Sequence, residues 1–144
     1  MELYKSFFGY RDFLKEEEVK QQISKSKYYT QSEDIKTAKA MNFFSTSIQK
    51  SWLIMTPRRL YCVLDDIKQP EASISWSIPN SKVVDDSGKV ILEIKVNDAY
   101  KENTGLIDFG SSRRSWLYSK SLFNNDGETL KSRIEELAKN EMKL

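Results

Sequence analysis

The sequence predicts a mainly β (α+β) protein, in which a bent antiparallel barrel of six to seven strands is closed by a C-terminal helix and preceded by an N-terminal helical extension. Three observations lead to this prediction. Short apolar or alternating segments follow one another between residues 40 and 123, no helical period lies among them, and one amphipathic helical pattern comes after them. A single apolar helical stripe can cover one end of a strongly bent sheet.

The chain begins with helical spacing over residues 1–26. Good helix formers occupy residues 16–18, 20 and 21. Apolar side chains before, among and after them recur at helical intervals, namely Phe7, Tyr10, Phe13, Leu14, Val19 and Ile23. Residues 24–37 are polar and without a period, which indicates a linker. We therefore expect an N-terminal helical extension with its linker (residues 1–37) and a β domain (residues 38–144). The sequence leaves open whether the extension packs on the barrel or projects from it.

Seven segments have the composition of strands: residues 38–48, 51–55, 60–64, 73–78, 90–96, 105–109 and 115–123. Thr56-Pro57-Arg58-Arg59 separates the second from the third and places proline at the first corner of a tight turn, which predicts a hairpin over residues 50–65. In residues 73–78 apolar side chains alternate with serines. A period of two is typical of a half-buried antiparallel strand.

The last segment has the signals of a helix that starts after Asn125. Asn125 and Glu128, three residues later, resemble a capping box in which Asn replaces the usual Ser or Thr. Beyond them one apolar stripe contains Leu130, Ile134, Leu137 and Ala138. This stripe predicts the helix that closes the barrel.

Histidine is absent from the 144 residues, and Cys62 is the only cysteine. Their scarcity excludes His-based acid–base catalysis, Ser-His and Cys-His nucleophiles, and ordinary zinc sites. The chain has five glycines and no phosphate-cradling glycine motif. Asp65-Asp66 and Asp85-Asp86 lack the spacing of a calcium loop and predict acidic turns. We therefore expect a protein that is not an enzyme and that holds no metal or cofactor.

The N-terminus lacks the basic start and apolar stretch of a signal peptide, and the longest apolar run, residues 60–64, is far shorter than the ~20 residues of a membrane helix. A single cysteine cannot form an internal disulfide, and Cys62 lies in an apolar run that indicates a buried structural thiol. These features predict a cytoplasmic protein. With 23 Lys and Arg against 21 Asp and Glu, the net charge of +2 is too slight to predict a nucleic-acid partner.

Two segments resemble the pleckstrin-homology-like superfold, particularly its bacterial and GRAM-type branch. Trp52-Leu-Ile-Met-Thr-Pro-Arg-Arg-Leu-Tyr-Cys-Val-Leu64 is similar to the early hairpin of that branch, in which an apolar strand runs into Thr-x-x-Arg-Leu and returns as a second apolar strand. Ser73-Ile-Ser-Trp-Ser-Ile-Pro-Asn-Ser-Lys-Val83 is similar to the strand that follows. The resemblance covers about residues 38–144, and it implies a barrel plugged by its last helix. Members of the superfold bind phosphoinositides, peptides or protein surfaces, and membership alone does not decide among these ligands.

The predicted hairpin contains the first candidate ligand site. Lys50, Arg58 and Arg59 lie in or beside it, and guanidinium groups make bidentate contacts with phosphate or carboxylate. The structural alternative is that Arg59 packs over the sheet and bonds a nearby carboxylate or carbonyl, while Arg58 is solvated at the turn. The basic series typical of phosphoinositide-binding members is absent from this hairpin.

Two further segments are candidate binding surfaces. Arg113 and Arg114 lie in a Gly-Ser-Ser turn beside Trp116 and Tyr118. Such an arrangement can hold an acidic partner or a nucleic acid strand, and its structural alternative is a solvated turn. The segment of residues 4–14 is rich in aromatic side chains, and we expect it to be a helix with Phe7, Phe8, Tyr10 and Phe13 as partner-binding residues. Its alternatives are packing on the barrel and docking on a membrane.

These observations favour a non-enzymatic binding or adaptor module that recognises a protein partner through a sheet edge, the N-terminal aromatic helix, or both. One alternative is binding of a phosphoinositide or another anionic membrane lipid through the basic hairpin around Arg58 and Arg59, with Lys50 and Lys82 contributing. The other is an enzyme without histidine, which would have to use Asp, Glu, Tyr, Lys or Ser and a deep pocket.

Overall fold

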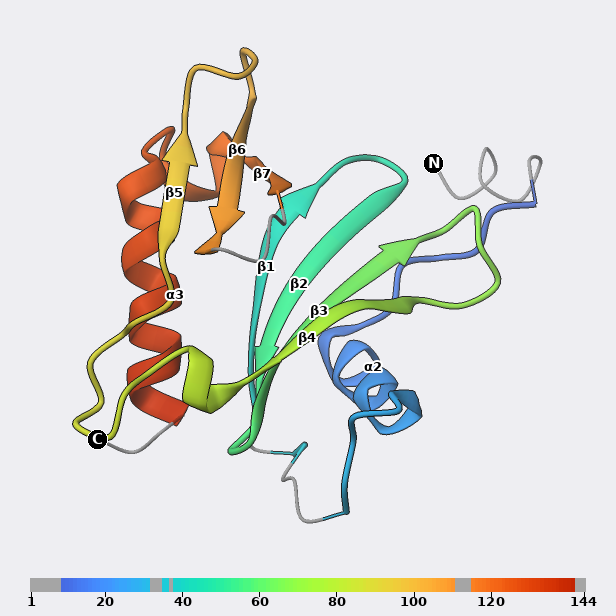
Figure 1. Ribbon diagram of the computed structural model, residues 1–144. Helices are drawn as coiled ribbons and strands as arrows, with labels where there is room; N and C mark the ends of the chain where they lie inside the picture. The colour runs from blue at the N-terminus through green and yellow to red at the C-terminus, as the bar shows by residue number, and fades with distance from the viewer. Residues whose placement is uncertain (1–8, 32–34, 37, 111–114, 142–144) are drawn as a thin grey trace. The chain divides into compact units, whose positions relative to one another are not determined.

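The computed structural model describes residues 9–31, 35–36, 38–110 and 115–141, and the chain divides into two compact units, Met1–Ser77 and Ile78–Leu144. The described part is mainly β, as predicted, with seven strands in two antiparallel sheets and two α-helices (Figure 1). The first unit contains α2 (Glu16–Gln21), the 3₁₀ helix η1 (Gln22–Lys25), β1 (Lys39–Ser45), β2 (Gln49–Met55), β3 (Arg59–Asp66) and most of β4 (Ser73–Pro79). The second contains η2 (Asn80–Lys82), β5 (Ile94–Asn97), β6 (Thr104–Phe109), β7 (Ser115–Ser119), η4 (Lys120–Phe123) and α3 (Gly127–Glu141).

The prediction of one closed barrel is wrong for the described strands. They form a four-stranded sheet in the order β1-β2-β3-β4 and a separate three-stranded sheet in the order β5-β6-β7, and no strand of one sheet pairs with a strand of the other. Periodicity within a strand specifies which side chains are buried, but it carries no information about which strands share hydrogen bonds. The boundary expected at residue 38 stays a prediction.

The hairpin predicted over residues 50–65 is confirmed. β2 and β3 pair in a continuous antiparallel register from Gln49 opposite Asp66 to Met55 opposite Leu60. At the tip, the buried hydroxyl of Thr56 accepts hydrogen bonds from the backbone N–H groups of Arg58 (3.2 Å) and Arg59 (3.1 Å). A threonine hydroxyl used in this way replaces part of the backbone pairing of the turn.

The prediction of a helix throughout residues 1–26 is wrong over residues 10–15, which are not helical. Here the backbone instead bonds to the end of β3 and the residue after it: Arg11 N–H donates to the Ile67 carbonyl (3.1 Å), and Leu14 N–H donates to the Asp65 carboxylate (2.9 Å). These tertiary hydrogen bonds replace the i→i−4 bonds that a helix would make. Within residues 9–26, which the structure describes, α2 and η1 keep the expected helical character.

The described part of residues 1–37 packs on the four-stranded sheet, which answers the question that the sequence leaves open. Val19 and Ile23 are fully buried and join one apolar cluster with side chains of β2 and β3, namely Ile54, Tyr61 and Val63. The loop before β1 adds Ile35 and Ala38 to the same cluster. This packing stabilises a six-residue helix that would be unstable alone.

In the second unit α3 packs against β5 (Figure 1). The strand predicted over residues 90–96 begins only at Ile94, because Val90 forms an isolated bridge with Val84 and the Ile91 N–H donates to the Val83 carbonyl (2.8 Å). β5, β6 and β7 then pair antiparallel in chain order. Ser115 starts β7 as predicted, but the strand ends at Ser119, where η4 begins.

The first turn of α3 differs from the expected capping box. Asn125 has a left-handed backbone (φ 63°), and Asp126 caps the helix instead. Its carboxylate accepts hydrogen bonds from the Glu128 N–H (3.0 Å) and from the Thr129 hydroxyl (3.0 Å). The predicted apolar stripe is buried, with Leu130, Ile134, Leu137 and Ala138 all inside.

Candidate functional site

The basic residues predicted at the hairpin separate into two places. Arg58 and Arg59 lie at the tip, whereas Lys50 lies near the opposite end of β2, where it pairs with Asp65. At about 3.3 Å per residue, the five-residue step from Lys50 to Met55 spans about 17 Å of strand. Lys50 places its ammonium group 4.6 Å from the centre of the Phe13 ring, a cation–π contact far from the tip.

Arg59 is held in place by β4 and by the segment after η1. Its guanidinium donates to the Ser77 hydroxyl (2.7 Å) and to the Ser77 carbonyl (3.3 Å), and its Cζ lies 4.4 Å from the centre of the Tyr28 ring. The structural alternative for Arg59, a bond to a nearby carbonyl, is therefore present in the structure. Arg59 fixes the hairpin tip to the end of β4.

Arg58 is exposed, and its Nη1 donates to the hydroxyl of Thr30 (2.8 Å). Lys27, also exposed, places its ammonium group 5.2 Å from the centre of the Tyr28 ring. We call Lys27, Tyr28, Thr30, Arg58 and Arg59 the tip cluster. Tyr28, with 41% of its surface exposed, is its central aromatic platform.

The tip cluster is cationic. Among the residues that the structure describes, no carboxylate lies within ion-pair distance of Lys27, Arg58 or Arg59. Lys27 and Arg59 lie at one exposed ring, and Arg58 is the neighbouring residue of the hairpin tip. Three positive charges in this region favour a negatively charged group. Sequence reasoning did not find Lys27, Tyr28 and Thr30, because they lie in a polar segment without a period and reach the hairpin only through the fold.

β4 lies at one edge of the four-stranded sheet and ends beside this cluster. Among the described strands, it pairs with β3 on one side and with no strand on the other. Ser73 and Ser75 are exposed, Trp76 is buried, and Ser77 holds Arg59. Residues 73–79 contain no charged side chain. An uncharged edge strand of this kind presents backbone donors and acceptors that a further strand can pair with.

Of the aromatic residues predicted to bind a partner, Tyr10 and Phe13 are half-buried in the non-helical segment before α2, and Phe13 contacts Lys50 as described. Phe7 and Phe8 lie outside the described residues, and so do Arg113 and Arg114. Lys82 is exposed in η2 of the second unit.

The two predicted acidic turns have different structures. Asp65 lies within β3 and is buried, so it belongs to no turn. Asp85 does lie in a turn, where its carboxylate accepts hydrogen bonds from the Ser87 hydroxyl (2.8 Å) and from the backbone N–H groups of Ser87 and Lys89. The Ser87 hydroxyl and the Lys89 N–H lower the pKa of Asp85 below its ordinary value.

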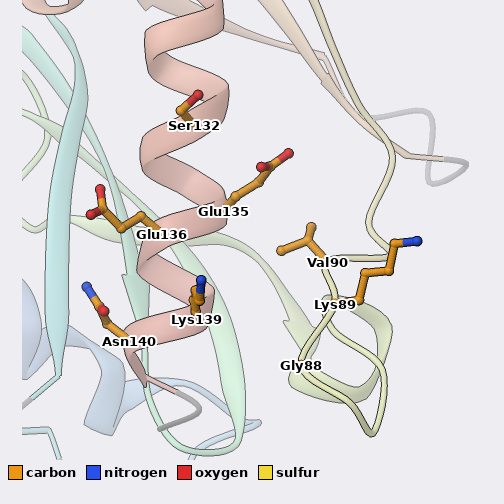
Figure 2. A pocket seen from close by; sticks show the side chains of 8 residues that line it. All are labelled: Gly88, Lys89, Val90, Ser132, Glu135, Glu136, Lys139 and Asn140. Atoms are coloured by element: carbon orange, nitrogen blue, oxygen red, sulfur yellow. The ribbon is translucent and has the colours of Figure 1, made fainter. Parts of the chain in front are cut away.

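An open groove of about 630 Å³ lies in the second unit between the turn that follows Asp85 and α3 (Figure 2). Its lining combines the apolar Val90 with both signs of charge and with small polar groups, namely Lys89, Glu135, Glu136, Lys139, Ser132 and Asn140. Figure 2 shows the α3 side chains spread around the helix rather than converging on one point. The lining therefore gives no preference for one ligand class.

A smaller groove of about 260 Å³ lies on the three-stranded sheet. Glu93, Lys95, Asp108 and Ser115 line it, and they pair with one another: Lys95 with Glu93 (3.1 Å) and the Ser115 hydroxyl with Asp108. In the described ranges, no three His, Cys, Asp or Glu side chains are grouped so that they could hold a metal ion. No helix among those residues is long and apolar enough to cross a membrane.

Comparisons with protein-family models, with curated proteins and with solved structures each find no match. A functional assignment therefore rests on the residues of this chain. Of the places described above, the β4 edge and the tip cluster are the two with a definite chemical preference, one for an extended backbone and one for an anion.

Proposed function

We propose that this protein is a non-enzymatic binding module of the pleckstrin-homology-like kind, and that it recognises an extended segment of a protein partner by strand addition at β4. The order of its elements supports the resemblance: a four-stranded antiparallel sheet, a three-stranded antiparallel sheet and then a C-terminal helix. The observation that carries the functional proposal is the uncharged edge formed by β4.

Edge strands are usually protected against pairing by lysine, by proline, by bulges or by inward-pointing charge. The proline of β4, Pro79, is the last residue of the strand and leaves residues 73–77 without such protection. The opposite edge of the same sheet has such protection, because β1 carries the exposed Lys39 and an irregular register between Asn42 and Phe44. In residues 73–77 of β4 there is neither lysine nor any other charge. The difference between the two edges supports β4 as the edge that accepts a partner.

The side chains on β4 are compatible with an added strand. In strand addition, main-chain hydrogen bonds supply affinity and alternate side chains supply specificity. Ser73 and Ser75 are small, polar and exposed, so they do not block the approach of another backbone. Arg59 holds the end of the edge through Ser77, which keeps the strand ordered before a partner arrives.

The test is a selection of displayed random peptides on the full chain, followed by affinity measurements on the enriched peptides. The double variant Ser73→Lys/Ser75→Lys places two charged, mobile side chains along the edge and is expected to weaken binding at least about tenfold. The matched control is Ser47→Lys/Ser81→Lys, which adds the same charges at exposed serines outside β4. Thermal unfolding checks that both variants fold. If no peptide is enriched, or if both variants bind equally, strand addition at β4 is refuted.

The tip cluster supports a second candidate function, binding to an anionic membrane surface. Its cations have no carboxylate partner among the described residues, and Arg58 is exposed. This function predicts salt-sensitive sedimentation with vesicles that contain phosphatidylserine, and its loss in Arg58→Glu. Arg58 is a better test residue than Arg59, because the contacts of Arg59 with Ser77 would be broken as well. Unchanged sedimentation of Arg58→Glu would refute this site.

A further inference from the structure

We infer that the segment added to β4 carries an acidic side chain or a terminal carboxylate at the end that lies beside Ser77, where the tip cluster receives it. The inference rests on the proposed strand addition, and it names the chemistry of the partner. It follows from the charges that the fold places at the two ends of the β4 edge.

The two ends of this edge differ in charge. Just before β4 the carboxylate of Glu71 lies 3.5 Å from the Lys25 ammonium, so this pair is neutral in sum. At the other end, the hydrogen bonds of Arg59 to Ser77 place the tip cluster against the strand. A segment paired along β4 therefore meets a neutralised pair at one end and, at the other, cations that have no carboxylate partner among the described residues.

Within the tip cluster, the cations have different tasks. Arg59 is engaged by Ser77 and by the Tyr28 ring, which makes it a positioning residue. Arg58 uses its Nη1 on Thr30, and a guanidinium has five N–H donors, so further donors remain for a ligand. The ammonium group of Lys27 is exposed beside the same ring. Arg58 and Lys27 are thus the residues that contact the acidic group.

The geometry favours an acidic peptide over a lipid surface. Binding to an anionic leaflet by charge alone typically uses four to eight clustered Lys and Arg. Here three cations are grouped, and one of them is already engaged by Ser77. They also lie at the end of an uncharged strand edge that offers backbone pairing and serine hydroxyls, which a lipid headgroup cannot use. An extended chain that carries one carboxylate can pair with the β4 edge and place that carboxylate at the tip cluster.

The test uses peptides enriched on the full chain, each synthesised in two forms that differ only by Asp or Glu against Asn or Gln at the acidic position. Each exposed ion pair is expected to contribute about two- to fivefold in affinity, so the acidic form binds more tightly at low salt and loses its advantage at high salt. The variant Lys27→Glu/Arg58→Glu should remove or reverse this preference. The control Lys39→Glu/Lys68→Glu makes the same change of charge at exposed lysines of the first unit outside the tip cluster, and it should keep the preference.

The outcomes separate this inference from the proposed function. If peptides bind and Ser73→Lys/Ser75→Lys weakens them, but wild type shows no preference for the acidic form, strand addition stands and the inference is overturned. A preference that survives in Lys27→Glu/Arg58→Glu overturns the inference as well. If phosphatidylserine vesicles are bound through Arg58 and no peptide preference exists, the anion is a lipid and the inference is again overturned. If no peptide is enriched, strand addition itself fails and the inference fails with it.

Discussion

Arg11 and Asp65 form an ion pair with 2.6 Å between Nη2 and Oδ1, although 54 positions of sequence separate them. The Asp65 side chain is fully buried, and 22% of the Arg11 side chain is exposed. Arg11 also donates to the carbonyls of Gln69 (2.8 Å) and Asp66 (3.2 Å). The pair therefore attaches the segment before α2 to the end of β3.

The unequal burial of this pair leads to an unequal effect of mutation. Arg11→Ala leaves a buried carboxylate without its cation and is expected to lower the free energy of unfolding by about 3 kcal/mol. Asp65→Asn leaves an arginine that can turn toward water and keeps an oxygen that can accept from the Leu14 N–H, so its effect should be smaller. Urea unfolding of both variants and of the double variant measures this. Adding Asp65→Asn to Arg11→Ala should recover stability, and a double variant less stable than Arg11→Ala would contradict the ion-pair explanation.

Lys20 is the second buried charge whose contacts predict a large effect. Its ammonium group donates to the carbonyls of Lys36 (2.9 Å) and Ala38 (3.4 Å), and it lies 3.2 Å from the Glu17 carboxylate. Lys20→Met keeps the length of the side chain but leaves the two carbonyls without this donor, so we expect a loss of about 1–3 kcal/mol in the free energy of unfolding. Lys15→Met, at an exposed position of the same segment, should change stability by less than about 0.5 kcal/mol. Equal effects of the two would refute the role of Lys20.

Gly105 is required by the packing of Tyr118. A Cβ atom at Gly105 would overlap the ring of Tyr118, and this ring is fully buried. Gly105→Ala is expected to destabilise the protein by about 2–3 kcal/mol through overpacking. Gly9→Ala is the comparison: its φ of 74° costs about 1–2 kcal/mol, but no atom of the described residues lies within 4 Å of the added atom. Thermal unfolding that ranks Gly9→Ala as the more damaging change would contradict this prediction.

The turn at Asp85 predicts a pH dependence of stability. Hydrogen bonds from the Ser87 hydroxyl and the Lys89 N–H lower the pKa of Asp85 in the folded state. Between this folded-state pKa and the higher unfolded-state pKa, the unfolded chain therefore binds more protons than the folded protein. The contribution of Asp85 is therefore fully present above the unfolded pKa, near 3.9, and it is lost as the pH falls through the lowered folded value.

The variant Asp85→Asn tests this sign, with urea unfolding of both proteins measured from pH 7 down to pH 2. The stability advantage of wild type over Asp85→Asn should be constant near neutral pH and should shrink below about pH 4. Asp86→Asn removes the neighbouring exposed carboxylate and is the control for the loss of one negative charge in this turn. A stability advantage of wild type that grows as the pH falls would contradict the predicted pH dependence.

Local patterns predicted the elements that depend on neighbouring residues. The Thr-Pro-Arg-Arg turn joins two apolar runs, and β2 and β3 pair around it in the register that the turn requires. The apolar stripe of α3 is buried as its helical spacing indicates. By contrast, the helical spacing of Tyr10, Phe13 and Leu14 is misleading, because the backbone there bonds to β3 and to the residue after it.

The candidate site was predictable only in part. Arg58 and Arg59 could be singled out because charged residues in a tight turn between apolar strands are exposed to a ligand or to solvent. Tyr28 could not, because its position beside Arg59 arises when the segment after η1 packs on the sheet. Lys50 was grouped with the arginines by sequence, but the length of β2 separates it from them.

The sequence by itself determined where the strands and the last helix lie, because hydrophobic period and turn chemistry act between residues a few positions apart. Tertiary structure decided the rest: that the strands form two sheets instead of one closed barrel, that Asp65 is a buried partner of Arg11, and that Thr30 meets Arg58 across 28 positions. These contacts depend on which apolar surfaces pack against each other, and that packing is determined by residues from all parts of the chain together.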